Sequence, residues 1–551
     1  MKILFAVICL FLSANTLGDD NKQAAIASAH PLATQAGFEI LKQGGNAFDA
    51  AIAVSAALAV VEPSGSGLGG GGFWLLHRAS DGFQTMIDGR ETAPSSAHQD
   101  MYLDEDGMVN KRLSLDGALA AAIPGVPAAL DHLSKEYGRL PLSQSLAPAI
   151  RYAKQGFKVS HHYQKLAGFR LDALNSSTDS RAIFLRNGQV PALNTLITQA
   201  DLAKTLEQIA KQGRAGFYQG NIAQKLIKGV QDAGGIWTLE DLHQYQIKER
   251  LPITSTYKGY TVTSAALPSS GGIVLSSMLN QLEQLPLDTA DTSQRQHLIV
   301  ETMRRAYFDR SQYLGDADFV SVPVQQLTSK SYAKQLADSI DLQQATATNY
   351  QHNAELLKGE DTTHFSIIDK EGNRVSATLS INYPFGSGFI AKGTGVLLND
   401  EMDDFSAQIG SANVYGLVGN EANAIAGNKR PLSSMSPTFI ENGHRLMLIG
   451  TPGGSRIITM VLLGILDFID GKLADTIVSQ PRFHHQYLPN KVQVESVGFN
   501  AEALDKLQQR GHQIKVLARQ YGNMQVIIQN KIAHQLTAAS DPRGEGLSLV
   551  Q

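Results

Sequence analysis

The chain has 551 residues, of which 43% are hydrophobic and 18% are charged, and its formal net charge is −4. This balance is typical of a globular protein. Because nucleic-acid surfaces need clustered Lys and Arg, it argues against a nucleic-acid partner. The length predicts several domains or one large layered unit.

The first residues, MKILFAVICLFLSANTLGDD, have the layout of a cleavable export signal. The apolar run Ile3–Leu12 is too short to cross a bilayer as a helix. We predict a signal peptide over residues 1–18, cut between Ala14 and Asp19, and a periplasmic or secreted protein with no stable membrane anchor. The alternative is a buried N-terminal helix or strand. Since the only cysteine, Cys9, lies here, the mature chain would have no disulfide and no thiolate metal site.

Residues 23–62 are predicted to be helical. PLATQAGFEILK has apolar residues at helical spacing before a Gly pair, and AFDAAIAVSAALAVV is apolar nearly all round, as in a buried helix. A G-x-G-x-x-G run follows at Gly65, Gly67 and Gly70, before a predicted strand Phe73–His77. A dinucleotide site requires the order strand, glycines, helix. The order here is the reverse, so we predict a tight bend with close backbone packing.

Further along the chain, residues 125–245 and 293–345 are predicted to be mainly helical, and residues 252–264 alternate like strands. Residues 340–361 are polar and predict an exposed linker. After it come the strand candidates HFSIID, RVSATLSIN, GTGVLLN, RLMLIG, KVQVES, QIKVLA and MQVIIQN. A helix-rich first two-thirds therefore precedes a strand-rich last third, and the linker can join two halves of one layered core.

HFSIID and RVSATLSIN flank KEGN, a hairpin turn signal. With Glu371-Gly372 as a two-residue turn, Thr363 lies opposite Ser380 and Thr362 opposite Ile381, and a slip of a residue or two is possible. One face of the second strand is apolar, and the other carries Ser376, Thr378, Ser380 and Asn382. By pattern alone, a plain amphipathic hairpin with a polar outer face is the simpler interpretation.

Thr362 is a candidate nucleophile if the chain is cut immediately before it. A threonine hydroxyl needs an adjacent base, and the chain has no G-x-S-x-G elbow for a serine-type mechanism. A cut before Thr362 would place its own α-amino group, with a pKa of about 7.7–8.0, beside Oγ. The polar linker makes that cut sterically feasible.

TTHFSIIDKEGN, followed by NYPFGSG, resembles the gamma-glutamyltransferases, N-terminal-nucleophile enzymes that cleave themselves before a Thr. The resemblance continues in LLNDEMDDFS, NVYGLVGNEANAIAGNKRPLSSMSPT, GTPGGSRIIT, PRFHHQYLP, QGGNAFDAAIAVSAALAVVEPSGSGLGGGGF and DGRETAP, and covers nearly the whole mature chain. It implies an α+β fold, a four-layer αββα sandwich built from two autoproteolytic subunits. These would be a helix-rich large subunit, residues 19–361, and a strand-rich small subunit, residues 362–551.

The resemblance also implies residue roles. Thr362 would attack the carbonyl of Asp361 during self-cleavage and the γ-amide of a substrate afterwards. Ser380 stands where many members have Thr, so that the hydroxyl is kept and a methyl is lost. The implied oxyanion hole is formed by the N–H groups of Gly453 and Gly454. The implied substrate-binding residues are Arg90, Asn382, Glu401, Asp404, Ser433, Ser434 and Tyr415.

These substrate-binding residues suit a free amino acid end. Arg90 can grip a carboxylate in a bidentate manner, with the two serines as further donors. Asp404, with Glu401 and Asn382, can hold an ammonium group. Tyr415 lies in a Gly- and Asn-rich stretch that resembles the family's lid loop, which related cephalosporin acylases tend to lack.

We therefore expect a gamma-glutamyltransferase and glutathione hydrolase that uses water, amino acids or peptides as acceptors and needs no cofactor or metal. Its large and small subunits would form a heterodimer. A β-lactam side-chain acylase and an exported amino-acid-binding protein are the alternatives. The pairs His161-His162 and His484-His485 do not favour a metal site, because adjacent residues on a strand point to opposite faces.

Overall fold

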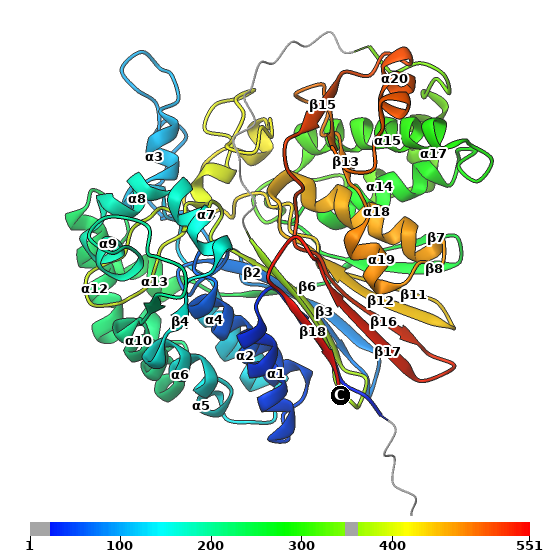
Figure 1. The fold of residues 1–551 in the computed structure, drawn as a ribbon. Helices are drawn as coiled ribbons and strands as arrows, with labels where there is room; N and C mark the ends of the chain where they lie inside the picture. Colours follow the sequence, from blue (N-terminus) through cyan, green and yellow to red (C-terminus); the bar gives the residue numbers. More distant parts are fainter. Residues whose placement is uncertain (1–21, 348–361) are drawn as a thin grey trace, which may run out of the picture.

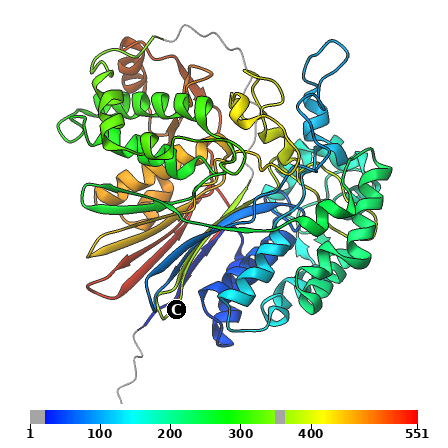
Figure 2. The ribbon, with the colours of Figure 1, turned by 180° about the vertical axis from the view of Figure 1, so that it is seen from behind.

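The computed structural model describes residues 22–347 and 362–551, so the predicted signal peptide, most of the predicted linker and Asp361 lie outside the described residues. Two β-sheets are stacked face to face, and helices cover the outer face of each (Figures 1 and 2). This arrangement confirms the predicted α+β fold, a four-layer αββα sandwich. Among the described helices, none combines the length and apolar character that crossing a membrane requires.

The first sheet has seven strands, and segments from both sides of the predicted cut contribute to it. In spatial order they are β18 (Leu547–Val550), β1 (Ala25–Ser28), β9 (Thr363–Ile368), β10 (Arg374–Ser380), β2 (Gly71–Arg78), β3 (Phe83–Asp88) and β6 (Lys248–Arg250). Every neighbouring pair is antiparallel. The strand that begins after Thr362 thus lies in the interior of the sheet, flanked by β1 and β10.

The second sheet has six strands and is likewise shared between the two segments. Its order is β17 (Gln535–Ser540), β16 (Gln525–Asn530), β12 (Arg445–Gly450), β11 (Thr438–Glu441), β8 (Tyr260–Ser264) and β7 (Ile253–Tyr257). A small third sheet joins β13 (Phe483–His484), β14 (Val492–Glu495) and β15 (Ile514–Leu517), and β4 (Phe157–Lys158) pairs with β5 (Leu196–Ile197). Because both large sheets mix the two segments, the linker joins two halves of one core.

One helical layer packs on the first sheet. It consists of α1 (Pro31–Lys42), α2 (Ala47–Val61), α4 (Val126–Glu136), α5 (Leu142–Ser145), α6 (Ala147–Gln155), α7 (His161–Phe169), α8 (Leu171–Ser176), α9 (Thr178–Phe184), α10 (Ala200–Gln212), α11 (Ala215–Tyr218), α12 (Gly220–Asp232) and α13 (Leu239–Gln244), with α3 (Lys111–Leu115) beyond it. The other layer consists of α14 (Gly271–Leu282), α15 (Thr292–Tyr313), α16 (Val324–Leu327), α17 (Lys330–Asp338), α18 (Ile457–Ile469), α19 (Ala474–Ser479) and α20 (Ala501–Gln509).

Helix α2 is buried along its whole length, as its all-round apolar pattern predicts. Its N-terminus is closed by a capping box between Asn46 and Asp49. The glycines after it form the predicted bend: a Cβ added to Gly69 or Gly70 would lie 2.1 Å from the carbonyl oxygen of Leu397 or Ser380. Only glycine allows the backbones to approach this closely.

Two strand predictions differ from the structure. The segment GTGVLLN forms only isolated bridges, Ile390 with Leu397 and Leu398 with Gly69, because no long ladder runs beside it. Conversely β1, within the region predicted as helical, is a strand, because it is paired on both sides by β9 and β18.

The hairpin of β9 and β10 forms as predicted, but its turn has three residues instead of two. Asp369 faces Asn373 across the turn, and its Oδ1 accepts hydrogen bonds from the N–H groups of Glu371 and Asn373. Gly372 has φ +90°, which the turn requires. Thr363 therefore pairs with Leu379, and the predicted register was wrong by one residue.

Both faces of the hairpin are buried, so the polar outer face that the simple pattern suggests is absent from this hairpin. Val375, Ala377 and Leu379 join the core under α2. Ser376, Thr378 and Ser380 face the second sheet, and none is more than 3% exposed. Buried hydroxyls need hydrogen-bond partners; Thr378 finds one in the buried ring of His364, at 2.8 Å.

Candidate active site

Thr362 stands directly before β9 and is 6% exposed. Its φ of 106° lies in a region that β-branched residues rarely adopt, and such strain persists only where the surroundings hold it. Its Oγ1 lies 2.9 Å from Ser380 Oγ. Ser380 Oγ in turn accepts a hydrogen bond from the backbone N–H of Asn382, at 2.9 Å. The one-residue change in register is what brings the two hydroxyls together.

Thr362 and Ser380 line a small cavity of about 20 Å³. Every residue predicted from the sequence as catalytic or substrate-binding lines it, except Gly453, which is next to the lining residue Gly454. The sequence reasoning missed three apolar members of the wall, Leu417, Met435 and Ile457. The cavity brings together residues from positions 90, 362–382, 401–417 and 433–457.

Arg90 is 1% exposed and forms the charged wall of the cavity. Its Nη1 lies 2.7 Å from Glu401, its Nη2 lies 2.6 Å from Asp404, and its Nε donates to the carbonyl of Pro431 at 3.1 Å. Burial raises the pKa of Glu91 to about 7 and the pKa of Glu401 well above its ordinary value, and Arg90 opposes both shifts. Three carboxyl groups thus surround one guanidinium, and a second cation beside them would favour their ionised forms.

The hydroxyl groups of Ser433 and Ser434 form a serine wall of the cavity. Ser433 Oγ accepts from the N–H of Met435 at 3.1 Å, and Ser434 Oγ accepts from Arg310 at 3.2 Å. Tyr415 covers the nucleophile side, since its hydroxyl donates to the carbonyl of Asn382 at 2.8 Å. The predicted lid residue therefore touches the strand end that carries Ser380.

Gly453 and Gly454 have φ values of 135° and 57°. Within the described ranges, 22–347 and 362–551, neither amide N–H makes a hydrogen bond. A Cβ on Gly454 would lie 2.4 Å from the Tyr415 ring. Two adjacent glycines with unpaired amides at the cavity edge are suited to bind an oxyanion.

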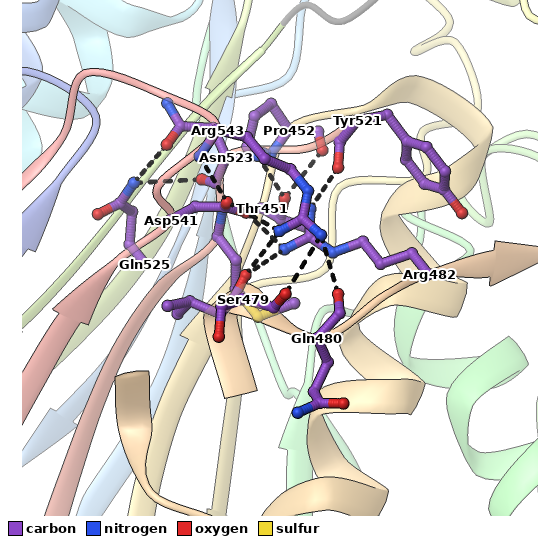
Figure 3. Close-up of polar contacts among 12 residues, drawn as sticks. Thr451, Pro452, Ser479, Gln480, Arg482, Tyr521, Asn523, Gln525, Asp541 and Arg543 are labelled. Carbon is purple, nitrogen blue, oxygen red and sulfur yellow. Dashed lines mark hydrogen bonds and ion pairs between the residues drawn. The ribbon is translucent and has the colours of Figure 1, made fainter. Parts of the chain in front are cut away.

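A buried ionic cluster supports the segment before these glycines. Figure 3 shows Thr451 and Pro452 beside the side chains of Arg482, Asp541 and Arg543. Thr451 Oγ1 accepts from the N–H of Asn523 and donates to the carbonyl of Pro452. Asp541 pairs with both arginines and accepts from the N–H of Met524. The glycine pair is thereby fixed to strand β16, and no short motif signals this contact.

The sequence reasoning also missed Glu62, which caps the C-terminal end of α2. A Cβ on Gly65 would lie 3.2 Å from the Thr362 carbonyl oxygen and 3.3 Å from the Glu62 carboxyl carbon, so both groups flank this glycine. Burial raises the pKa of Glu62 to about 8, partly opposed by the nearby hydroxyl of Thr363.

We expect Glu62→Gln to stabilise the protein in a pH-dependent way. The unfolded chain ionises this group near pH 4.5, but the folded chain keeps it protonated up to about pH 8. The folded state binds the extra proton, so stability falls as pH rises through this window. The variant's Tm should exceed that of the wild type by a margin that grows by roughly 5 °C between pH 4.5 and 8. Glu136→Gln, which removes an exposed carboxyl group, is the control; a margin that does not change with pH would contradict the expectation.

The histidine pairs of the sequence do not gather metal ligands. His161 and His162 lie in α7, and His484 is buried beside Thr459. In the part of the chain that the structure describes, the grouping with metal-ligand geometry is His297, Glu301 and His512. The two rings there already share a hydrogen bond of 2.8 Å, and Glu301 is paired with the arginines of its own helix, Arg304 and Arg305.

The chain matches the family model described as gamma-glutamyltranspeptidase over residues 33–550. It is 44% identical to the glutathione hydrolase proenzyme of Escherichia coli (strain K12), over 95% of this chain and 90% of that protein. It is 40% identical to the protein of the same name from Pseudomonas aeruginosa, over 96% and 94%. Among solved structures, cephalosporin acylase from Bacillus halodurans is similar with a TM-score of 0.84 and 30% identity, over 96% of both chains. The gamma-glutamyltranspeptidase of Helicobacter pylori is 42% identical over 57% of this chain and 90% of that chain, with a TM-score of 0.56.

Proposed function

The chain belongs to the gamma-glutamyltranspeptidase family, and from this premise we propose how its residues divide the reaction. The protein is a gamma-glutamyltransferase and glutathione hydrolase, and it is made as a proenzyme that is processed into two subunits. We propose that the cut falls between Asp361 and Thr362 and separates residues 19–361 from 362–551. The export signal over residues 1–18, and hence a periplasmic or secreted location, is part of the same proposal.

Thr362 Oγ acts first on its own chain. It attacks the carbonyl carbon of Asp361, the peptide C–N bond breaks, and an ester joins the two residues while the α-amino group of Thr362 is released. Water then hydrolyses the ester and restores the hydroxyl. Ser380, 2.9 Å from Oγ1, holds the hydroxyl in place for this step. The strained φ of Thr362 favours the rearrangement, because the new chain end is free of the constraint.

The same oxygen then acts on the substrate. Thr362 Oγ attacks the γ-carbonyl carbon of a glutamyl amide and passes its proton to the free α-amino group, whose pKa of about 7.7–8.0 suits a base near neutral pH. The amides of Gly453 and Gly454 stabilise the oxyanion. The leaving amine takes the proton and departs, and water, an amino acid or a peptide opens the ester.

The cavity is complementary to a zwitterion. Glu401, Asp404 and Asn382 form the side that receives the substrate ammonium, since the carboxyl groups there outnumber Arg90. Arg90, Ser433 and Ser434 form the carboxylate side. Tyr415 closes the nucleophile side and restricts water.

One observation favours a second candidate: the similarity to a cephalosporin acylase extends over the whole described fold. A β-lactam acylase would use the same nucleophile but would not need the zwitterion site or the Tyr415 cover. The charged wall of Arg90, Glu401 and Asp404 therefore favours γ-glutamyl substrates. An exported amino-acid-binding protein without catalysis would not be processed before Thr362.

The observation that carries the proposal is the 2.9 Å contact between Thr362 and Ser380 in a cavity with a zwitterion-binding wall. We expect the purified protein to release p-nitroaniline from γ-glutamyl-p-nitroanilide, and faster when glycylglycine is added as acceptor. Hydrolysis of a cephalosporin side chain at a higher kcat/KM than this anilide would favour the acylase instead. Absence of both activities would contradict the proposal.

A further inference from the structure

Arg310 lies on α15, behind the serine wall of the cavity, and is 5% exposed. Its Nε donates to Ser270 Oγ at 3.0 Å, and its Nη2 donates to Ser434 Oγ at 3.2 Å. Ser270 in turn donates from both its N–H and its hydroxyl to the carbonyl of Ser433. The guanidinium thus contacts Ser434 directly and reaches Ser433 through Ser270.

Arg310 differs from the other buried arginines by its charge environment. Each of the others in the described residues has a carboxylate within 4.0 Å: Arg90, Arg170, Arg304, Arg374, Arg430 and Arg482. Arg310 has none within that distance among the residues that the structure describes, and Asp404 acts on it only through space. A buried guanidinium without a counter-ion is costly, so an anion is expected to approach it when the cavity is occupied.

The hydrogen-bond polarity of Ser434 follows from its partner. A guanidinium can only donate, so Ser434 Oγ must accept from it. In residues 22–347 and 362–551 the Ser434 hydroxyl donates no hydrogen bond, and Ser434 lines the cavity. Its proton is therefore available to a carboxylate there, and the charge of Arg310 strengthens that donation.

Arg90 is less available than its position suggests. Each of its three nitrogens already has an oxygen partner, in Glu401, Asp404 or Pro431. A substrate carboxylate would have to share these nitrogens with two protein carboxyl groups. Arg310 adds a second positive charge behind the serine side of the cavity, and this one has no carboxylate partner among the described residues.

We propose that Arg310 is a positioning residue that supplies, through Ser434, a second positive charge beside that of Arg90 for the α-carboxylate of the γ-glutamyl donor. The inference rests on the proposed function, because it specifies how the carboxylate side of the same cavity works. It predicts that the contribution of Arg310 depends on the presence of that carboxylate.

The test compares two donors that differ by one group: γ-glutamyl-p-nitroanilide and 4-aminobutanoyl-p-nitroanilide, which lacks the α-carboxylate. For Arg310→Gln we expect KM for the glutamyl donor to rise about 10- to 100-fold with kcat changed less than about threefold. With 4-aminobutanoyl-p-nitroanilide as donor, the kcat/KM of Arg310→Gln should differ from that of the wild type by less than about threefold. Arg310→Lys keeps the positive charge, so its KM for the glutamyl donor should rise less than that of Arg310→Gln. Arg295→Gln, on the same helix but in a pair with Asp470, should leave KM unchanged.

Ser434→Ala provides an independent test of the inference. It should raise KM for the glutamyl donor to a similar extent, and the double variant should be little worse than either single one, because both act on one contact. For each variant, two bands on a denaturing gel show that folding and processing are intact. If Arg310→Gln is not processed, the inference is tested with Arg310→Lys and Ser434→Ala. Equal losses with both donors, or full additivity, would overturn the inference. A wild-type protein inactive on the glutamyl donor would instead refute the proposed function.

Discussion

Thr362→Ala is expected to leave one unprocessed polypeptide and to lower p-nitroaniline release at least about 10⁴-fold, because both reactions need the same oxygen. The wild type should give two bands near roughly 37 and 20 kDa by residue count. The measurement is a denaturing gel together with the γ-glutamyl anilide assay, and mass spectrometry should find Thr362 at the new N-terminus.

Thr363→Ala is the matched control for this experiment. The two threonines are adjacent, but strand alternation turns Thr363 away from Ser380, toward Glu62. We expect this variant to be processed into two bands and to remain active. If Thr362→Ala were cut at the same bond, or if Thr363→Ala alone abolished the cut, Thr362 would not be the nucleophile.

Gly454→Ala is expected to lower kcat about 100-fold or more. The added Cβ would lie 2.4 Å from the Tyr415 ring, and a φ of 57° costs an alanine about 1–2 kcal/mol. The loop would have to move, and the proposed oxyanion donors would move with it; losing one such donor typically costs about 10²–10³ in kcat. Single-turnover kinetics of the processed variant measures the acylation step directly.

Gly443→Ala is the control for a glycine replaced at a loop. Its Cβ would meet no atom within 4 Å, so we expect unchanged turnover. A Gly454→Ala variant with full kcat would show that the loop tolerates the displacement and that the oxyanion is stabilised elsewhere. Processing is followed on the same samples, so that loss of turnover is not confused with a failure to cut.

Local sequence patterns predicted those helices and strands that keep one burial pattern along their whole length. The all-round apolar run Ala47–Val61 can only be a buried helix, and the alternation in Arg374–Ser380 can only be a strand. Short elements were missed because four residues carry too little pattern: β1 is a strand because β9 and β18 pair with it on both sides. The register of the hairpin depended on Asp369, whose side chain closes a three-residue turn that the Glu-Gly signal does not reveal.

The sequence by itself identified the candidate nucleophile, because the residues around Thr362 resemble those of a family that cleaves itself before a Thr, and such a cut would supply the base that a threonine hydroxyl needs. Only the tertiary structure decided how the cavity is charged. Arg90 meets Asp404 across 314 positions, and Arg310 meets Ser434 across 124. Helical and strand periods report which face of an element is apolar, but they carry no information on which distant charge will lie opposite. That pairing is set by the stacking of the layers, since burial makes each unpaired charge costly until a particular partner, or a ligand, lies beside it.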